Sequence, residues 1–145
     1  MRQINKIILH CSATQEGKEY DREDIKEWHL QRGFTDIGYH YVILLDGTIQ
    51  EGRDIRTIGA HCSGHNTVSI GICYIGGLDE NGKGKDTRTT EQRIALFQLV
   101  DELLTAYDLT IEDVHAHYEY AKKLCPCFNI EQFRLEYMRF KRHLS

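Results

Sequence analysis

The sequence has one proline, Pro126, one tryptophan and no long hydrophobic run in its 145 residues. No segment approaches the roughly 18 consecutive apolar residues of a membrane-spanning helix. The N-terminal stretch "MRQINKIILHCS" contains only the short apolar run "IIL", which is too short for the hydrophobic part of a secretory signal. We therefore expect a protein that is made in the cytoplasm without a signal peptide and that has no membrane partner.

The chain also lacks an excess of charge of one sign. Eighteen Lys and Arg residues stand against 22 Asp and Glu residues, which gives a net charge of −4, and the basic residues are scattered. The sequence therefore lacks the basic patch or stripe that is typical of nucleic-acid-binding proteins, and no nucleic-acid partner is expected. The length and the 41% hydrophobic content predict one domain that spans residues 1–145, and we expect a monomer.

The number of cysteines is odd, so they cannot all pair within the chain. Five cysteines, at positions 11, 62, 73, 125 and 127, make a disulfide framework improbable for a chain made in the cytosol. Cys73 lies within the apolar run "SIGICYIGG" and is expected to be a small buried residue. Cys127 has two interpretations: a thiol that competes for metal or forms a disulfide, or a small buried residue near a helix start. We favour the second.

Hydrophobic periodicity and turn signals predict alternating strands and helices. The residues 76–90 contain glycine and charged residues and are expected to form an exposed loop. The dipeptide Asp46-Gly47 suits a tight primed turn between two strands. The expected elements are a strand at 6–10, a helix between Asp21 as cap and Gly33, a hairpin at 38–52, a strand at 67–77, a helix from Thr89 to 107 with Gln92 in capping-box spacing, a strand at 113–117 and a helix from Asn129 to 144.

This order predicts an α/β fold in which a central mixed β-sheet is flanked by about three α-helices. Two of the strands, "KIILH" and "DVHAH", end in histidine, namely His10 and His117. Ligands tend to bind at the carboxyl ends of strands in open α/β sheets, so these two histidines are expected to meet there.

His10, His117 and Cys125 together offer two imidazoles and a thiolate, which zinc accepts as ligands. Three protein ligands leave a fourth position open, where water can become acidic enough to act as a nucleophile near neutral pH. Pro126 would restrict the backbone beside the thiolate. Eight histidines and five cysteines allow many combinations, however, and hydrogen-bonded core or surface histidines are common. The spacing alone leaves both interpretations open.

Whole phrases of the sequence carry a more specific signal. These are "ILHCSAT", "WHLQRGFTDIGYHYVILLDGTIQEGRD", "GAHCSGHN", "SIGICYIGG" and "HAHYEYAKKLCPCFNI". In order and spacing they resemble the zinc-dependent N-acetylmuramoyl-L-alanine amidases of the small phage-lysozyme type, which are related to peptidoglycan recognition proteins. The resemblance runs from about residue 7 to about residue 137, and it implies the fold of that family.

The resemblance implies the following roles. His10, His117 and Cys125 would bind one zinc ion per chain, and Tyr39 and Lys123 would be catalytic. His61 and Asn66 match a loop that borders the substrate groove in similar proteins. Apart from the resemblance, Tyr39 is also typical of a half-buried strand residue and Lys123 of a solvated loop residue.

Expectations for five other residues complete the analysis of the sequence. His40 is expected to pack or to form a hydrogen bond, and Arg53 to be structural. His115 is interpreted as a partner of a metal ligand or as an exposed histidine. Many relatives have arginine at the position of Tyr118, so the role of this position is open. Similar proteins often have glycine at the position of Cys127, for which we favour the buried residue near a helix start.

The implied reaction is hydrolysis of the amide between N-acetylmuramic acid and L-alanine in peptidoglycan, as by an endolysin of a phage or prophage. The general base stays open among Tyr39, Glu119 and solvent. The enzyme would act on the cell wall after release or secretion. The alternative is a non-catalytic peptidoglycan-binding module on the same fold, and a third possibility is a regulatory protein that docks on another macromolecule.

Overall fold

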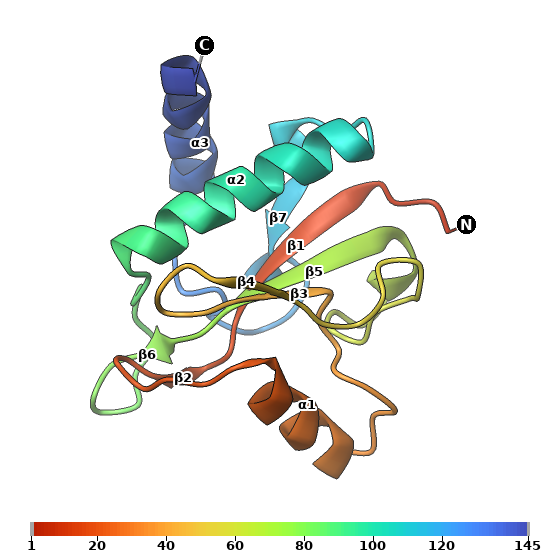
Figure 1. Cartoon of the computed structure of the whole chain (residues 1–145), viewed down its shortest axis with the longest axis vertical. Coiled ribbons are helices and arrows are strands. Elements are labelled where there is room, and N and C mark those ends of the chain that lie inside the picture. Colours follow the sequence, from red (N-terminus) through yellow and green to blue (C-terminus); the bar gives the residue numbers. More distant parts are fainter. Residues whose placement is uncertain (1, 145) are drawn as a thin grey trace.

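The computed structural model describes residues 2–144, which form a five-stranded sheet with helices on both faces (Figure 1). The strands are β1 (Lys6–Cys11), β3 (Tyr41–Ile43), β4 (Ile49–Glu51), β5 (Ser69–Tyr74) and β7 (Val114–Ala116). Their order is β4-β3-β5-β1-β7. The strands β3, β5, β1 and β7 are parallel to their neighbours, and β4 is antiparallel to β3. The predicted mixed sheet is therefore confirmed.

Three α-helices lie within the described residues, namely α1 (Arg22–Gln31), α2 (Thr90–Ala106) and α3 (Ile130–Leu144). Their starts follow from the caps that the sequence predicts. The Asp21 carboxylate accepts hydrogen bonds from the backbone at the start of α1, and Thr89 forms a reciprocal capping box with Gln92 at the start of α2. Asn129 accepts a hydrogen bond from the backbone N–H of Gln132 in α3. None of these helices has the length and apolar character that crossing a membrane requires.

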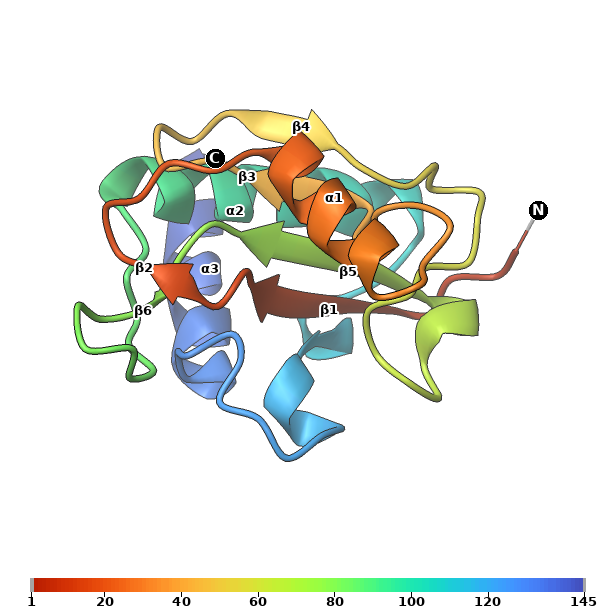
Figure 2. The ribbon, with the colours of Figure 1, turned by 90° about the horizontal axis from the view of Figure 1, so that it is seen from below.

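The two faces of the sheet bury different clusters of side chains. Ile7, Leu9 and Cys11 of β1 point toward α2 and α3, where they join the larger core. The residues that alternate with them face α1, and there Ile25 of the helix packs with Val42 and Cys73 of the sheet. Cys73 is fully buried, as predicted. Figure 2 shows α1 crossing this second face, with residues 117–129 running along the β1 side of the molecule.

Two details differ from the expectations. The hairpin turn is not a two-residue primed turn, because the backbone N–H of Leu44 pairs with the carbonyl of Thr48 and three residues form the loop, with Gly47 at φ 88°. The segment 76–90 is exposed only in part. Its start forms β6 (Gly77–Leu78), which pairs with β2 (Thr14–Gln15), and near its end Arg88 is buried over the ring of Phe128.

Three 3-10 turns complete the chain. They are η1 (Asn66–Val68), η2 (Ile111–Asp113) and η3 (His117–Glu119). The turn η3 follows β7 directly, so the chain changes direction at His117. This change of direction places the residues after β7 next to the end of β1.

Candidate metal centre

The neighbouring parallel strands β1 and β7 bring two histidines together. His10 is paired in register with Cys73, so its side chain lies on the α1 face of the sheet. Ala116 belongs to the opposite core, and the next residue, His117, therefore points to the same side as His10. The Nδ1 atoms of His10 and His117 are 3.1 Å apart. The expectation that these two histidines meet is confirmed.

Cys125 is the third member of this cluster. Its Sγ accepts a hydrogen bond from the backbone N–H of Cys11 at 3.1 Å and lies 3.9 Å from Nδ1 of His10. The backbone N–H of Tyr118 donates to the carbonyl of Cys125 at 3.0 Å, and this bond holds Cys125 next to the residue that follows His117. One imidazole nitrogen of each histidine and the Sγ atom of Cys125 all lie within 4.8 Å of one another.

The electrostatics of the cluster favour neutral imidazoles. Burial lowers the pKa of His10 well below its usual value, and burial together with the Lys123 charge lowers the pKa of His117. Two neutral imidazoles and a sulfur are the donors that zinc prefers, and ligand atoms on one tetrahedral zinc ion lie roughly 3.3–3.6 Å apart. The separations of 3.1 and 3.9 Å involving His10 bracket that range, so this group of side chains fits a metal ion.

Tyr39 and Lys123, the two predicted catalytic residues, approach the cluster from different segments. The Tyr39 ring is half-buried and its centroid lies 5.1 Å from that of His10. Lys123 is exposed, and its ammonium group forms no hydrogen bond or ion pair with any other residue of the range 2–144. Its charge still acts on the cluster, because it contributes to the lowered pKa values of both histidines. The Tyr39 ring therefore lies beside His10, and the Lys123 charge acts on both histidines.

The predicted groove residues His61 and Asn66 lie in the loop before β5. His61 is buried, and its Nδ1 lies 2.8 Å from Nε2 of His10. The Asn66 side-chain oxygen accepts hydrogen bonds from the backbone N–H groups of His61 and Cys62, both at 2.9 Å. Asn66 thus holds the loop that carries His61.

Several other residues mentioned in the sequence analysis have structural partners. Arg53 donates hydrogen bonds to three backbone carbonyls, and Nδ1 of His40 accepts one from the backbone N–H of Gly71. Both expected roles are confirmed. His115 approaches the carboxylate of Glu119, which also accepts a hydrogen bond from the backbone N–H of Ala116.

The sequence did not reveal the role of Arg2, which lies before β1. Arg2 donates hydrogen bonds to the carbonyls of Ile55 and Ser69 and so holds both ends of the loop between β4 and β5.

The Tyr118 hydroxyl accepts a hydrogen bond from the backbone N–H of Ile130. Cys127 is half-buried, and its sulfur lies 4.0 Å from that of Cys11.

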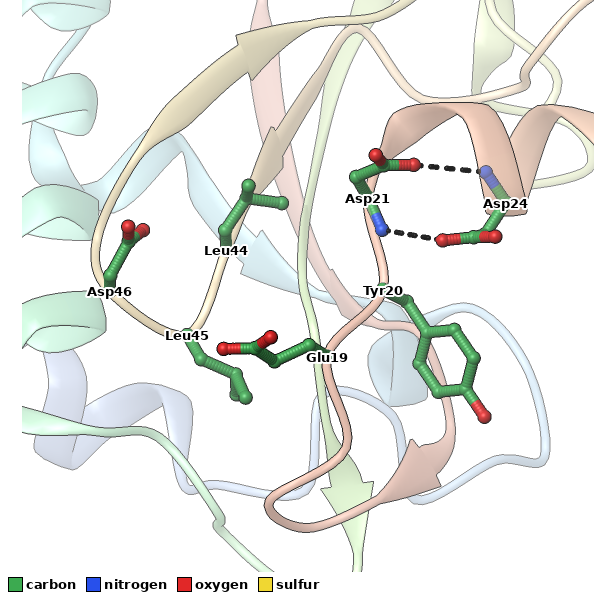
Figure 3. A pocket seen from close by; sticks show the side chains of 7 residues that line it. All are labelled: Glu19, Tyr20, Asp21, Asp24, Leu44, Leu45 and Asp46. Carbon is green, nitrogen blue, oxygen red and sulfur yellow. Dashed lines mark hydrogen bonds between the residues drawn. The ribbon is translucent and has the colours of Figure 1, made fainter.

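A separate hollow of about 290 Å³ lies between the start of α1 and the β3–β4 turn, where Leu44 and Leu45 line it with acidic side chains (Figure 3). The carboxylates of Asp21 and Asp24 are engaged in the capping box of α1, as the dashed lines in Figure 3 mark. These two carboxylates therefore serve the helix start. The candidate metal centre is therefore the cluster of His10, His117 and Cys125.

Comparison with known proteins agrees with this geometry. The family model of N-acetylmuramoyl-L-alanine amidase matches residues 1–128. The endolysin of Escherichia phage T7 is 39% identical over 127 residues, which cover 88% of this chain and 83% of the endolysin. The endolysin of Enterobacteria phage K11 is 34% identical over 132 residues, which cover 91% and 86% of the two chains.

Solved structures agree as well. The N-acetylmuramoyl-L-alanine amidase LysC from Clostridium intestinale superposes with a TM-score of 0.80 at 30% identity, covering 93% of this chain and 85% of its own. Drosophila PGRP-LB gives a TM-score of 0.73 at 25% identity, covering 87% and 76%. The expected amidase and peptidoglycan-recognition fold is confirmed, and the chain belongs to the N-acetylmuramoyl-L-alanine amidase family.

Proposed function

We propose that this protein is a zinc-dependent amidase that cleaves the bond between N-acetylmuramic acid and L-alanine in peptidoglycan. The observation that carries the proposal is the convergence of His10, His117 and Cys125 in a chain of the amidase family. The endolysins among its relatives support a role in lysis of the cell wall, reached after release or secretion. A binding module without catalysis would not need the thiol of Cys125, and we therefore favour the enzyme.

His10, His117 and Cys125 would hold the zinc ion through Nδ1, Nδ1 and Sγ. When bound, zinc supplies Lewis acidity, which polarises an amide carbonyl and makes water acidic enough to provide hydroxide near pH 7. The backbone N–H of Cys11, which donates to Sγ of Cys125, stabilises negative charge on that sulfur. The hydrogen bond therefore favours the thiolate form that a metal ligand requires.

Tyr39 and Lys123 would act on the substrate. Hydrolysis of an amide builds negative charge on the carbonyl oxygen, and hydrogen-bond donors or cations placed there lower the barrier. A phenol is protonated near neutral pH, so Tyr39 can donate a hydrogen bond to this oxygen. The Lys123 ammonium, which has no partner among residues 2–144, can supply positive charge at the same place.

The test is digestion of purified peptidoglycan with the zinc-loaded protein, followed by assays for new alanine amino groups and for new reducing sugars. We expect alanine amino groups to appear, and we expect a chelator or the substitution Cys125→Ser to abolish their release. Cys62→Ala is the matched control, because Cys62 is a buried thiol outside the cluster. Release of reducing sugars alone, or cleavage that survives both chelator and Cys125→Ser, would refute the proposal.

A further inference from the structure

A chain of hydrogen bonds leads away from the metal cluster into the sheet. Nε2 of His10 lies 2.8 Å from Nδ1 of His61, and Nε2 of His61 lies 3.3 Å from the hydroxyl oxygen of Ser69. The Ser69 hydroxyl in turn donates a hydrogen bond of 2.7 Å to the backbone carbonyl of His65. All three side chains of this chain are buried, and its last acceptor is a carbonyl, which cannot donate.

The carbonyl of His65, at the end of this chain, determines which nitrogen of each histidine ring carries the hydrogen. Because the single hydroxyl hydrogen of Ser69 points to the carbonyl, the Ser69 oxygen must accept from Nε2–H of His61. A neutral His61 with hydrogen on Nε2 has a lone pair on Nδ1, so Nδ1 accepts from Nε2–H of His10. Neutral His10 is then left with a lone pair on Nδ1, the atom that faces His117 and Cys125.

The opposite direction of the chain would be incompatible with metal binding. If His61 donated from Nδ1, His10 would accept at Nε2 and carry its hydrogen on Nδ1. That hydrogen would occupy the position at which a metal ion has to bind. Which nitrogen of His10 carries the hydrogen therefore depends on the direction of the hydrogen bonds, and Ser69 sets that direction.

The His61 ring is held in a narrow slot. A Cβ atom at Gly71 would lie 2.6 Å from Cγ of the imidazole, and one at Gly59 would lie 2.7 Å from its Cδ2. Such distances are far shorter than ordinary contacts between carbon atoms, so the ring needs glycine on both sides. The ring is thereby confined between two stretches of backbone, with both nitrogens engaged.

We propose that His61 is a positioning residue, directed by Ser69, that keeps His10 in the form with hydrogen on Nε2 and a free lone pair on Nδ1. This assignment replaces the substrate contact that the resemblance implies for His61. It rests on the proposed function, because it presupposes that His10 binds the metal. Partners of this kind, in which a group accepts from the second nitrogen of a metal-binding histidine, strengthen metal affinity 10–100-fold in other proteins.

The experiment measures zinc affinity by competition with a chromogenic chelator, and the protonation of the His10 ring by nitrogen-15 NMR. The variants are His61→Phe, which keeps a ring but has no acceptor, His61→Gln, which keeps a carbonyl oxygen, and Ser69→Ala. His143→Gln is the control, since His143 is an exposed histidine of α3 outside the chain of hydrogen bonds. Thermal unfolding of the metal-free variants verifies that each one folds.

We expect His61→Phe to weaken zinc binding about 10–100-fold, His61→Gln to restore most of the affinity, and the control to leave it unchanged. Ser69→Ala should shift hydrogen from Nε2 to Nδ1 of His10 in part of the metal-free protein. Equal affinity in all folded variants, or equal loss with Phe and Gln, would overturn the inference. So would a lower catalytic rate at unchanged zinc affinity, which would indicate substrate contact. Failure of the wild type to bind zinc would instead refute the proposed function.

Discussion

The phenol of Tyr74 donates a hydrogen bond of 2.7 Å to the backbone carbonyl of Pro126. Tyr74 is the last residue of the central strand β5, and Pro126 follows Cys125 directly. The bond therefore anchors the segment that carries the thiol to the middle of the sheet. Both residues are buried, so water cannot replace the donor if it is removed.

The substitution Tyr74→Phe should lower the free energy of unfolding by about 1–2 kcal/mol, because the buried carbonyl of Pro126 loses its donor. Zinc affinity should fall with it, since Cys125 is then less well held. Urea unfolding and chelator competition measure the two effects. Tyr107→Phe is the control, because the Tyr107 hydroxyl has no hydrogen bond with residues 2–144. Equal stabilities of the two variants would show that the bond is unimportant.

Tyr39→Phe and Lys123→Met should each reduce the rate of alanine release about 100–1000-fold, the usual effect of removing a group that stabilises the developing oxyanion. Zinc affinity should stay unchanged, because neither group belongs to the three donors. Steady-state rates and chelator competition separate these effects. The neighbouring Lys122→Met and the distant Tyr20→Phe serve as matched controls. A loss of rate that merely follows a loss of zinc would contradict the assigned roles.

Cys127 adopts φ 67°, a left-handed conformation that side chains with a Cβ rarely adopt. Cys127→Gly should therefore raise the free energy of unfolding by about 0.5–1 kcal/mol under reducing conditions, after the loss of its packing against Cys11 is included. Asp108→Gly, at φ 55° after α2, is a comparison at a second such position. Urea unfolding measures both. A less stable Cys127→Gly protein would mean that the sulfur contacts outweigh the backbone strain.

His29 should make the fold sensitive to mild acid. Burial first, and then the charges of Arg32 and Arg53, lower the pKa of His29 to about 4. The unfolded chain takes up this proton already near pH 6.5, so the free energy of unfolding contributed by His29 is complete above about pH 6.5 and decreases toward pH 4. Nδ1 of His29 accepts a hydrogen bond from Gly38, which neutral glutamine can replace.

The measurement is urea unfolding between pH 7 and 4.5 in the presence of chelator, so that metal release does not contribute. His29→Gln should lose about 1–2 kcal/mol less than the wild type over this interval. The exposed His143→Gln variant should behave like the wild type. Parallel curves for His29→Gln and wild type would show that His29 does not titrate as the structure indicates.

The elements with strong local signals could be predicted from the sequence. Thr89 and Gln92 define the start of α2 in any helical context, and the histidines after "KIIL" and "DVHA" end strands that become neighbours. These signals depend on residues close together in the chain. They predicted that His10 and His117 meet, whereas the choice of these two residues with Cys125 as metal ligands rested on the resemblance to the amidase family.

The features of the site and fold that the sequence could not predict depend on tertiary contacts. The loop around His61 has no periodicity, and the direction of its hydrogen bonds is set by Ser69 and the carbonyl of His65, which only the fold places beside it. Arg88 lies in a segment of exposed character, yet the ring of Phe128 covers its guanidinium. The left-handed φ of Cys127 likewise has no signature in a residue type that usually avoids it.

The three donors are far apart along the chain, since β1 supplies the first at position 10 and the segment after β7 supplies the last at position 125. A polypeptide still on the ribosome has no complete set until residue 125 has been added, and a fragment that ends earlier never acquires one. A truncated chain that ends before Cys125 is therefore expected to lack both metal binding and amidase activity, even if its sheet still forms.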